Sequence, residues 1–191
     1  MAFLPRLDAR PYGVLLLLAI ALSCITGAAR ASVLDDDAAT FLQRFIGYIE
    51  WPAQAFEQPG SAIVVGIAGS ENTLTLLTQA VTGKLSQGRP VQVQRLEKPD
   101  ERLAQVHLAF VGQEAWRYLP QWVTACRQHE VVLATDAPNG VAQGAVLGLV
   151  TTGQRTRFEA SPPAAAQVGV KLSARVLEVA ARGWGGGRWG A

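Results

Sequence analysis

Hydrophobic and polar residues alternate along the chain in patterns typical of strands and helices. Apolar positions at intervals of three and four residues between Phe41 and Ile49 predict a helix. The helix should begin near the acidic cluster at 35–37 and end by Trp51, because Pro52 disfavours helical geometry in the residue before it. Three apolar runs predict buried strands, at 62–69, 106–112 and 131–136. One alternating run predicts a more exposed strand, at 91–94.

The segments between and after these strands complete the expected fold. Ser70 can cap a helix over 71–81, and a helix over 113–128 should kink or break at Pro120. Two closely spaced strands, at 145–150 and 155–160, should form an antiparallel hairpin, and two helices should follow. The sequence therefore predicts an α/β fold: a three-layer sandwich, with a mostly parallel central sheet, a C-terminal antiparallel hairpin and helices on both faces.

The first residues have the pattern of an export signal. Arg6 and Arg10 precede an apolar run over 14–22, which is too short for the roughly 18 to 20 residues that span a bilayer. An A-x-A motif follows and predicts cleavage after Ala31, so residues 1–31 are expected to be a signal peptide and the protein to be periplasmic. Two alternatives remain: a retained anchor, and lipoprotein processing at Cys24, whose preceding residues fit a lipobox poorly.

Cleavage would leave one domain, 32–182, and a glycine-rich tail, 183–191, that is expected to be flexible. The remaining residues contain equal numbers of basic and acidic side chains, and no cluster of Lys and Arg suggests nucleic-acid binding. Only Cys126 would remain of the two cysteines, so an intrachain disulfide is excluded and burial of this thiol is expected.

No catalytic residue, metal ligand set or cofactor site is predicted. The chain lacks the nucleophile elbow G-x-S-x-G and the dinucleotide motif G-x-G-x-x-G. Gly69 and Ser70 join a strand to a helix, the position at which phosphate-binding loops occur. Because the glycine motif is absent, a tight turn is favoured over a phosphate site. Cys126 and His129 could share a helix face, but two ligands do not make a zinc site. The strand-to-helix loop leaves one alternative open, a periplasmic small-molecule binding or sensor module.

Several segments resemble the YfiR family of periplasmic regulators. The aromatic–x–x–Trp-Pro pattern lies at 45–52, and three strands lie at 65–69, 88–91 and 106–111. A strand–strand–"KLS"–helix closure follows at 144–160 and 169–177. The resemblance implies a non-enzymatic protein that restrains an inner-membrane diguanylate cyclase or sensor through its periplasmic region, and so affects cyclic-di-GMP and biofilm formation. It also implies a homodimer and release by an OmpA-like outer-membrane lipoprotein. Family members often contain cysteine pairs, which this chain lacks.

The candidate partner-binding residues follow mainly from this resemblance. Trp51 and Phe56 are expected to be apolar anchors, although large aromatic residues are also common in cores. Arg157, Glu159 and Lys171 are expected to be charges that orient the partner, although an edge strand often exposes such charges to solvent.

Overall fold

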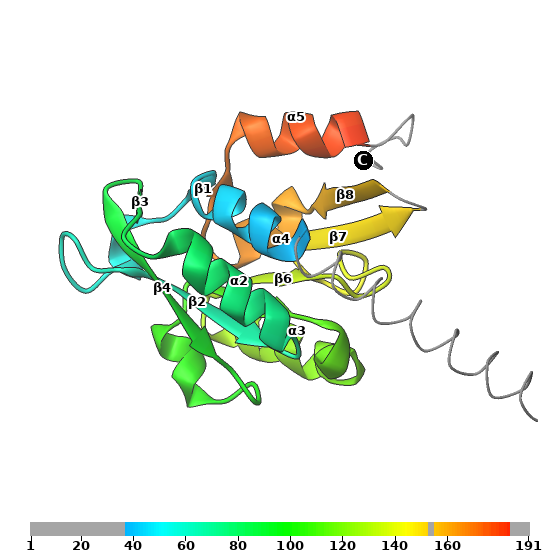
Figure 1. Ribbon diagram of the computed structural model, residues 1–191, viewed down its shortest axis with the longest axis horizontal. Helices are drawn as coiled ribbons and strands as arrows, with labels where there is room; N and C mark the ends of the chain where they lie inside the picture. The colour runs from blue at the N-terminus through cyan, green and yellow to red at the C-terminus, as the bar shows by residue number, and fades with distance from the viewer. Residues whose placement is uncertain (1–36, 153–154, 184–191) are drawn as a thin grey trace, which may run out of the picture. The chain divides into compact units, whose positions relative to one another are not determined.

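The computed structural model describes residues 37–152 and 155–183 (Figure 1). The expected signal peptide, 1–31, lies outside this part of the chain, as does the expected tail apart from Gly183. Among the described residues, no helix has the length and apolar character needed to cross a membrane.

A mixed, seven-stranded sheet forms the centre of the domain. Its strand order is β3-β4-β2-β5-β6-β7-β8, with parallel pairing from β4 to β7 and an antiparallel pair at each edge. Val65 illustrates the register, since it faces Val93 on one side and Leu108 on the other. The strands are β2 (Ile63–Ala68), β3 (Leu85–Ser86), β4 (Arg89–Arg95), β5 (Leu108–Val111), β6 (Val132–Thr135), β7 (Leu147–Thr152) and β8 (Arg155–Ala160).

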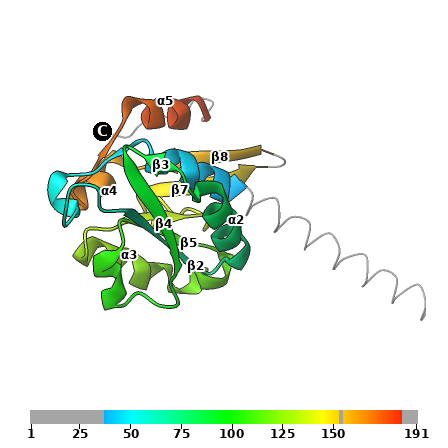
Figure 2. The same ribbon diagram turned by 60° about the vertical axis from the view of Figure 1, so that its left-hand side comes forward.

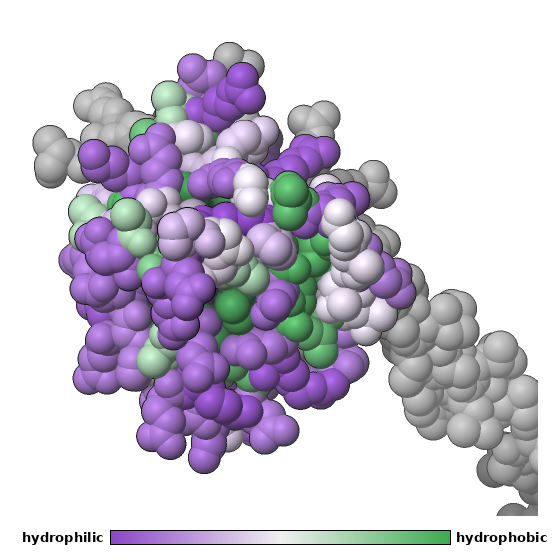
Figure 3. Space-filling model, turned by 90° about the vertical axis from the view of Figure 1, so that its left-hand side faces the viewer, coloured by the Kyte–Doolittle hydropathy of each residue, from purple (hydrophilic) through white to green (hydrophobic). Residues whose placement is uncertain are grey.

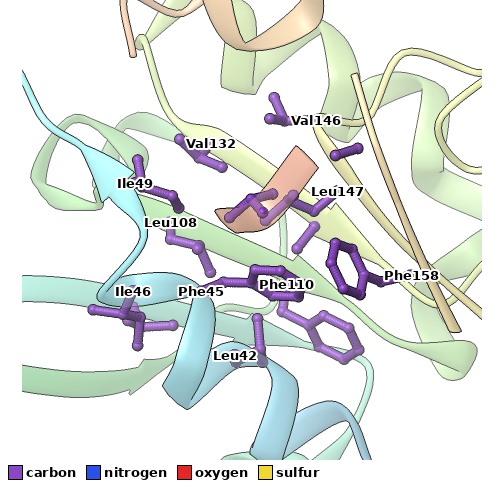
Figure 4. Packing of buried hydrophobic residues seen from close by; sticks show 14 of the residues in the cluster. Leu42, Phe45, Ile46, Ile49, Leu108, Phe110, Val132, Val146, Leu147 and Phe158 are labelled. Atoms are coloured by element: carbon purple, nitrogen blue, oxygen red, sulfur yellow. The ribbon is translucent and has the colours of Figure 1, made fainter. Parts of the chain in front are cut away.

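The first face of the sheet is covered by a helix over 37–46 and by α2, α4 and α5, of which α5 packs against β8. In the core on this face, the rings of Phe45 and Phe158 meet edge to face at 4.6 Å between centroids (Figure 4). The helices are α2 (Glu71–Val81), α4 (Pro162–Gln167) and α5 (Ala174–Gly183).

The second face is covered by α3 (Leu119–Gln128) and two 3₁₀ segments, η2 (Glu101–Gln105) and η3 (Gln113–Tyr118). Trp122 and Cys126 of α3 are almost fully buried in the core on this side. The two apolar clusters on opposite faces confirm the predicted three-layer sandwich (Figure 2).

Local sequence signals predicted the ends of several helices correctly. The Ser70 side chain accepts a hydrogen bond from the amide of Thr73, and α2 spans the predicted residues. The predicted break near Pro120 is confirmed, because η3 ends at Tyr118 and α3 begins with the proline in its first turn.

The predicted end of the first helix is wrong. The helix ends at residue 46, and the chain continues through a turn into β1 (Ile49–Glu50), which pairs antiparallel with β9 (Lys171–Leu172). The Gln87 side chain donates hydrogen bonds to the carbonyls of Ile46, at 3.2 Å, and Ile49, at 2.8 Å. Long-range backbone pairing therefore outweighs the helical periodicity that continues to Ile49.

The parallel neighbours β6 and β7 are joined by turns over 136–146 without a helix. Buried Thr135 anchors the start of this connection, since its hydroxyl donates to the carbonyl of Val111 at 2.6 Å and accepts from the amide of Ala137 at 3.1 Å. Asp136 accepts a hydrogen bond from the indole of Trp116 at 2.7 Å. The connection is thus held to β5 and η3 by side chains.

Candidate functional site

Two of the predicted anchors, Trp51 and Phe56, gather around His107. Both belong to the connection from β1 to β2, residues 51–61, here called the docking loop, which contains the 3₁₀ turn η1 (Ala53–Ala55). The rings of Phe56 and His107 stack at 4.7 Å between centroids, and Trp51 meets His107 edge on at 5.7 Å. All three side chains are half-buried, so the anchors are partly packed and partly available to a partner.

Trp51 and Phe56 pack against the core, whereas the rest of the docking loop has little apolar packing. Residues 53–55 and 57–60 are exposed, and the short backbone hydrogen bonds within the loop run from Ala55 to Pro52 and from Ser61 to Gln58. Arg89, at the start of β4, holds the loop from one side. Its guanidinium carbon lies 3.6 Å from the centroid of the Phe56 ring, and the group donates to the carbonyl of Ser61 at 2.9 Å.

His107, one residue before β5, holds the loop from the other side. Its Nδ1 accepts a hydrogen bond from the amide of Val64 at 3.1 Å, and its Nε2 lies 3.0 Å from the carbonyl oxygen of Ala55. Burial lowers the pKa of His107, and the positive charge of Arg89 lowers it too, whereas the bond to Ala55 acts in the opposite direction. The imidazole therefore joins the loop to β2 in its neutral form.

A hollow of about 600 Å³ lies beside the docking loop. Its walls come from the loop, the beginnings of β2 and β5, the end of α3 and the connection from α4 to β9, and include Val64, Val106, His129, Val168 and Val170. The indole Nε1 of Trp51 is buried and has no hydrogen-bond partner among the described residues. Figure 3 shows the side of the molecule that carries the loop, where a narrow band of hydrophobic residues lies among hydrophilic ones.

The other three candidates divide between this site and a distant edge. Lys171 of β9 is paired with Glu50, the residue before Trp51, so it lies next to the docking loop. Arg157 and Glu159 lie on β8, and β6 and β7 separate that strand from β5. The structure therefore brings Trp51, Phe56 and Lys171 together and places Arg157 and Glu159 elsewhere.

The strand-to-helix loop that suggested small-molecule binding is closely packed. The strand order reverses between β2 and β5, where open α/β sheets often bind ligands. A Cβ atom on Gly69, whose φ is +68°, would lie 2.5 Å from the backbone nitrogen of Ala115. One on Gly112 would lie 2.8 Å from the carbonyl oxygen of Gly69. The backbones of the two loops are thus in close contact, and a hollow of about 290 Å³ lies beside them, with Ser70, Glu114 and Tyr118 among its lining residues.

The described residues contain no group of three or more His, Cys, Asp or Glu side chains placed to hold a metal ion. Cys126 is buried whereas His129 is exposed, so these two residues do not form a common site. Burial raises the pKa of the Cys126 thiol to about 12, which leaves it protonated and unreactive at neutral pH.

Residues 36–181 match the model of the protein family DUF4154, described as YfiR/HmsC-like. The chain belongs to the YfiR/HmsC-like family. The family is one of periplasmic, regulatory and non-catalytic proteins, and the match confirms the resemblance found in the sequence.

Comparison with solved structures adds little to the YfiR/HmsC-like assignment. A conserved domain protein from Vibrio cholerae O1 biovar eltor str. N16961 aligns with a TM-score of 0.49 and 12% sequence identity. The alignment covers 61% of this chain and 53% of that chain, so the YfiR/HmsC-like chain spans about half the length of that structure. No protein with a curated description matches the sequence significantly.

The sequence prediction missed two residues of the YfiR/HmsC-like domain that organise the site. His107 was expected inside a buried strand, but it lies just before β5 and bonds to the docking loop. A polar residue at the start of an apolar run was the available signal. Arg89 gave no signal, because its contact with Phe56 joins segments far apart in the chain.

Proposed function

We propose that this YfiR/HmsC-like protein is an exported, non-enzymatic regulator that binds and restrains a membrane-bound signalling protein of the diguanylate cyclase type in the periplasm. Export would use the signal peptide cleaved after Ala31, with lipidation at Cys24 as the alternative route. Restraint would lower cyclic-di-GMP and biofilm formation. An OmpA-like outer-membrane lipoprotein would remove the regulator, which would act as a homodimer.

The observation that supports a docking role is the exposed loop that presents Trp51 and Phe56 beside the 600 Å³ hollow. Aromatic residues next to a hollow can anchor a partner, because they bury a large apolar area with few rotatable bonds. A regulator of this kind works only if it binds the inactive state of the cyclase better than the active state. Lys171 could supply a charge at the rim of the same surface.

Deletion of the gene and complementation with variants would test this role. We expect Phe56→Ala to bind the partner about 30-fold more weakly, the loss of an anchor worth about 2 kcal/mol, and to leave cyclic-di-GMP high. Tyr118→Ala is the matched control, because Tyr118 is an exposed aromatic residue with the Arg117 guanidinium 4.9 Å from its ring centroid, on η3. Full complementation by Phe56→Ala would contradict the docking site, and unchanged cyclic-di-GMP after gene deletion would contradict the function.

The alternative, a small-molecule binding module, is supported by the 600 Å³ hollow and by the hollow of about 290 Å³ at the strand-to-helix loop of Gly69 and Ser70. A thermal-shift screen with periplasmic metabolites separates the two functions. A true ligand at 100 times its dissociation constant would stabilise the protein by about 2.7 kcal/mol.

A further inference from the structure

We infer that His107 is a pH-operated latch on the docking loop: the neutral imidazole holds the loop against β2, and protonation releases it. The latch is a property of the isolated domain. Only its consequence for partner binding rests on the proposed function.

The hydrogen bonds of His107 fit only one of its protonation states. The Val64 amide is a donor, so Nδ1 must present a lone pair, and the Ala55 carbonyl is an acceptor, so Nε2 must carry the hydrogen. The imidazolium carries hydrogens on both nitrogens, and its Nδ1–H would face the Val64 N–H. Protonation therefore replaces a hydrogen bond with two opposed donors and leaves the Val64 amide without this acceptor.

The groups around His107 compensate for this loss only in part, because the Ala55 carbonyl favours the imidazolium but burial and Arg89 disfavour it. The positive Arg89 disfavours a second positive charge nearby, and burial does the same, which agrees with the lowered pKa of the imidazole. Glu57, His129 and Glu130 line the hollow, yet His107 forms no ion pair with any carboxylate of the described chain. The face of the Phe56 ring, on which His107 stacks, does not oppose a positive charge, so the sensitivity lies at the Val64 amide.

This bridge adds to the other contacts that hold the docking loop. Trp51 and Phe56 pack against the core, Arg89 contacts Phe56 and the Ser61 carbonyl, and the residues on either side of Phe56 are exposed. The exposed turn at Ala55, which the imidazole holds, is therefore the part of the loop that depends most on His107. Because the pKa of His107 is lowered from 6.5, the loop is held at neutral pH and is released only as pH falls through this lowered pKa. An exported regulator with this latch would bind its partner with lower affinity at acidic pH.

Nuclear magnetic resonance titration of the whole protein tests the latch directly. The chain has only two histidines, so the resonances of His107 can be assigned with a His129→Gln variant. We expect His107 to be the neutral Nε2–H tautomer at pH 7.5 and to have a pKa below 6.5. Exchange of the Val64 amide, corrected for the intrinsic effect of pH, should rise about fivefold or more as His107 titrates, the factor that one net hydrogen bond represents.

A conservative variant separates the latch from a merely structural role. His107→Gln can accept from Val64 and donate to Ala55 at every pH, so its loop should show no acid response, whereas His129→Gln should respond like the wild type. A pKa of His107 at or above 6.5, or an acid response retained in His107→Gln, would overturn the latch. If His107→Gln does not fold, the tautomer and exchange data on the wild type decide alone. Failure of the wild type to bind the cyclase at any pH would instead count against the proposed function.

Discussion

Thr135→Val tests how the helix-free connection between β6 and β7 is held. Thr135 is fully buried, and valine has nearly the same shape without the hydroxyl that bonds to Val111 and Ala137. The amide of Ala137, a residue only 4% exposed, would then lack this acceptor. An unsatisfied buried donor costs about 1–3 kcal/mol, and the more apolar side chain offsets part of that cost. We expect a net loss of about 1.5 kcal/mol.

A domain of this size should then melt roughly 3–6 °C lower, measured by differential scanning calorimetry. Thr135→Ser is the control, because it keeps the hydroxyl and loses the methyl group that packs towards Gly140. Both variants should be less stable, but only Thr135→Val should lose protection of the Ala137 amide against hydrogen exchange. A valine variant that melts at or above the wild-type temperature, with the amide still protected, would refute the reasoning.

Three further predictions concern the thiol, the distant charges and pH. With Cys24→Ser in place, Cys126 should not react with Ellman's reagent until the protein unfolds, because burial raises its thiol pKa to about 12; rapid labelling of the native protein would contradict its burial. Glu159→Lys should melt normally yet bind the periplasmic region of the proposed partner at least about fivefold more weakly in calorimetry, whereas Glu101→Lys on η2 should not; equal affinities would remove Glu159 from the partner surface. Because the pKa of His107 is lowered, the folded state binds fewer protons than the unfolded state below about pH 6.5, so the free energy of unfolding should fall as pH drops through that range. Denaturant titrations of His107→Gln should lack this part of the slope, and an identical slope would contradict it.

The parts of the fold that were predicted correctly depend on local signals. Ser70 caps α2 with its own side chain, and Pro120 cannot lie deep inside a helix, so both boundaries could be inferred from a few neighbouring residues. The β3–β4 hairpin was missed, because its two-residue turn places Gln87 at φ 53° before Gly88, where Asn or Asp would be the usual signal.

The candidate site was predicted only in part, because most of its contacts join segments that are far apart in the sequence. Trp51 and Phe56 stand out in the sequence as large aromatic residues, and Trp51 precedes a proline. The contacts that position them come from Arg89, in β4, and His107, just before β5, and periodicity carries no information on such pairs. Arg157 and Glu159 lie on an edge strand, but their separation from the docking loop depends on the strand order.

The small β1–β9 sheet determines when the start of the docking loop can be held in its folded position. Strand β1 leads directly into the docking loop, and its partner strand comes near the end of the domain; the Ser173 amide extends the pairing by bonding to the Tyr48 carbonyl at 3.0 Å. A chain that is not yet complete lacks Lys171–Leu172, so its β1 has no strand with which to pair. The β1–β9 pairing thus forms only when the C-terminal segment is present, and under the proposed function a C-terminally truncated protein would bind its partner more weakly.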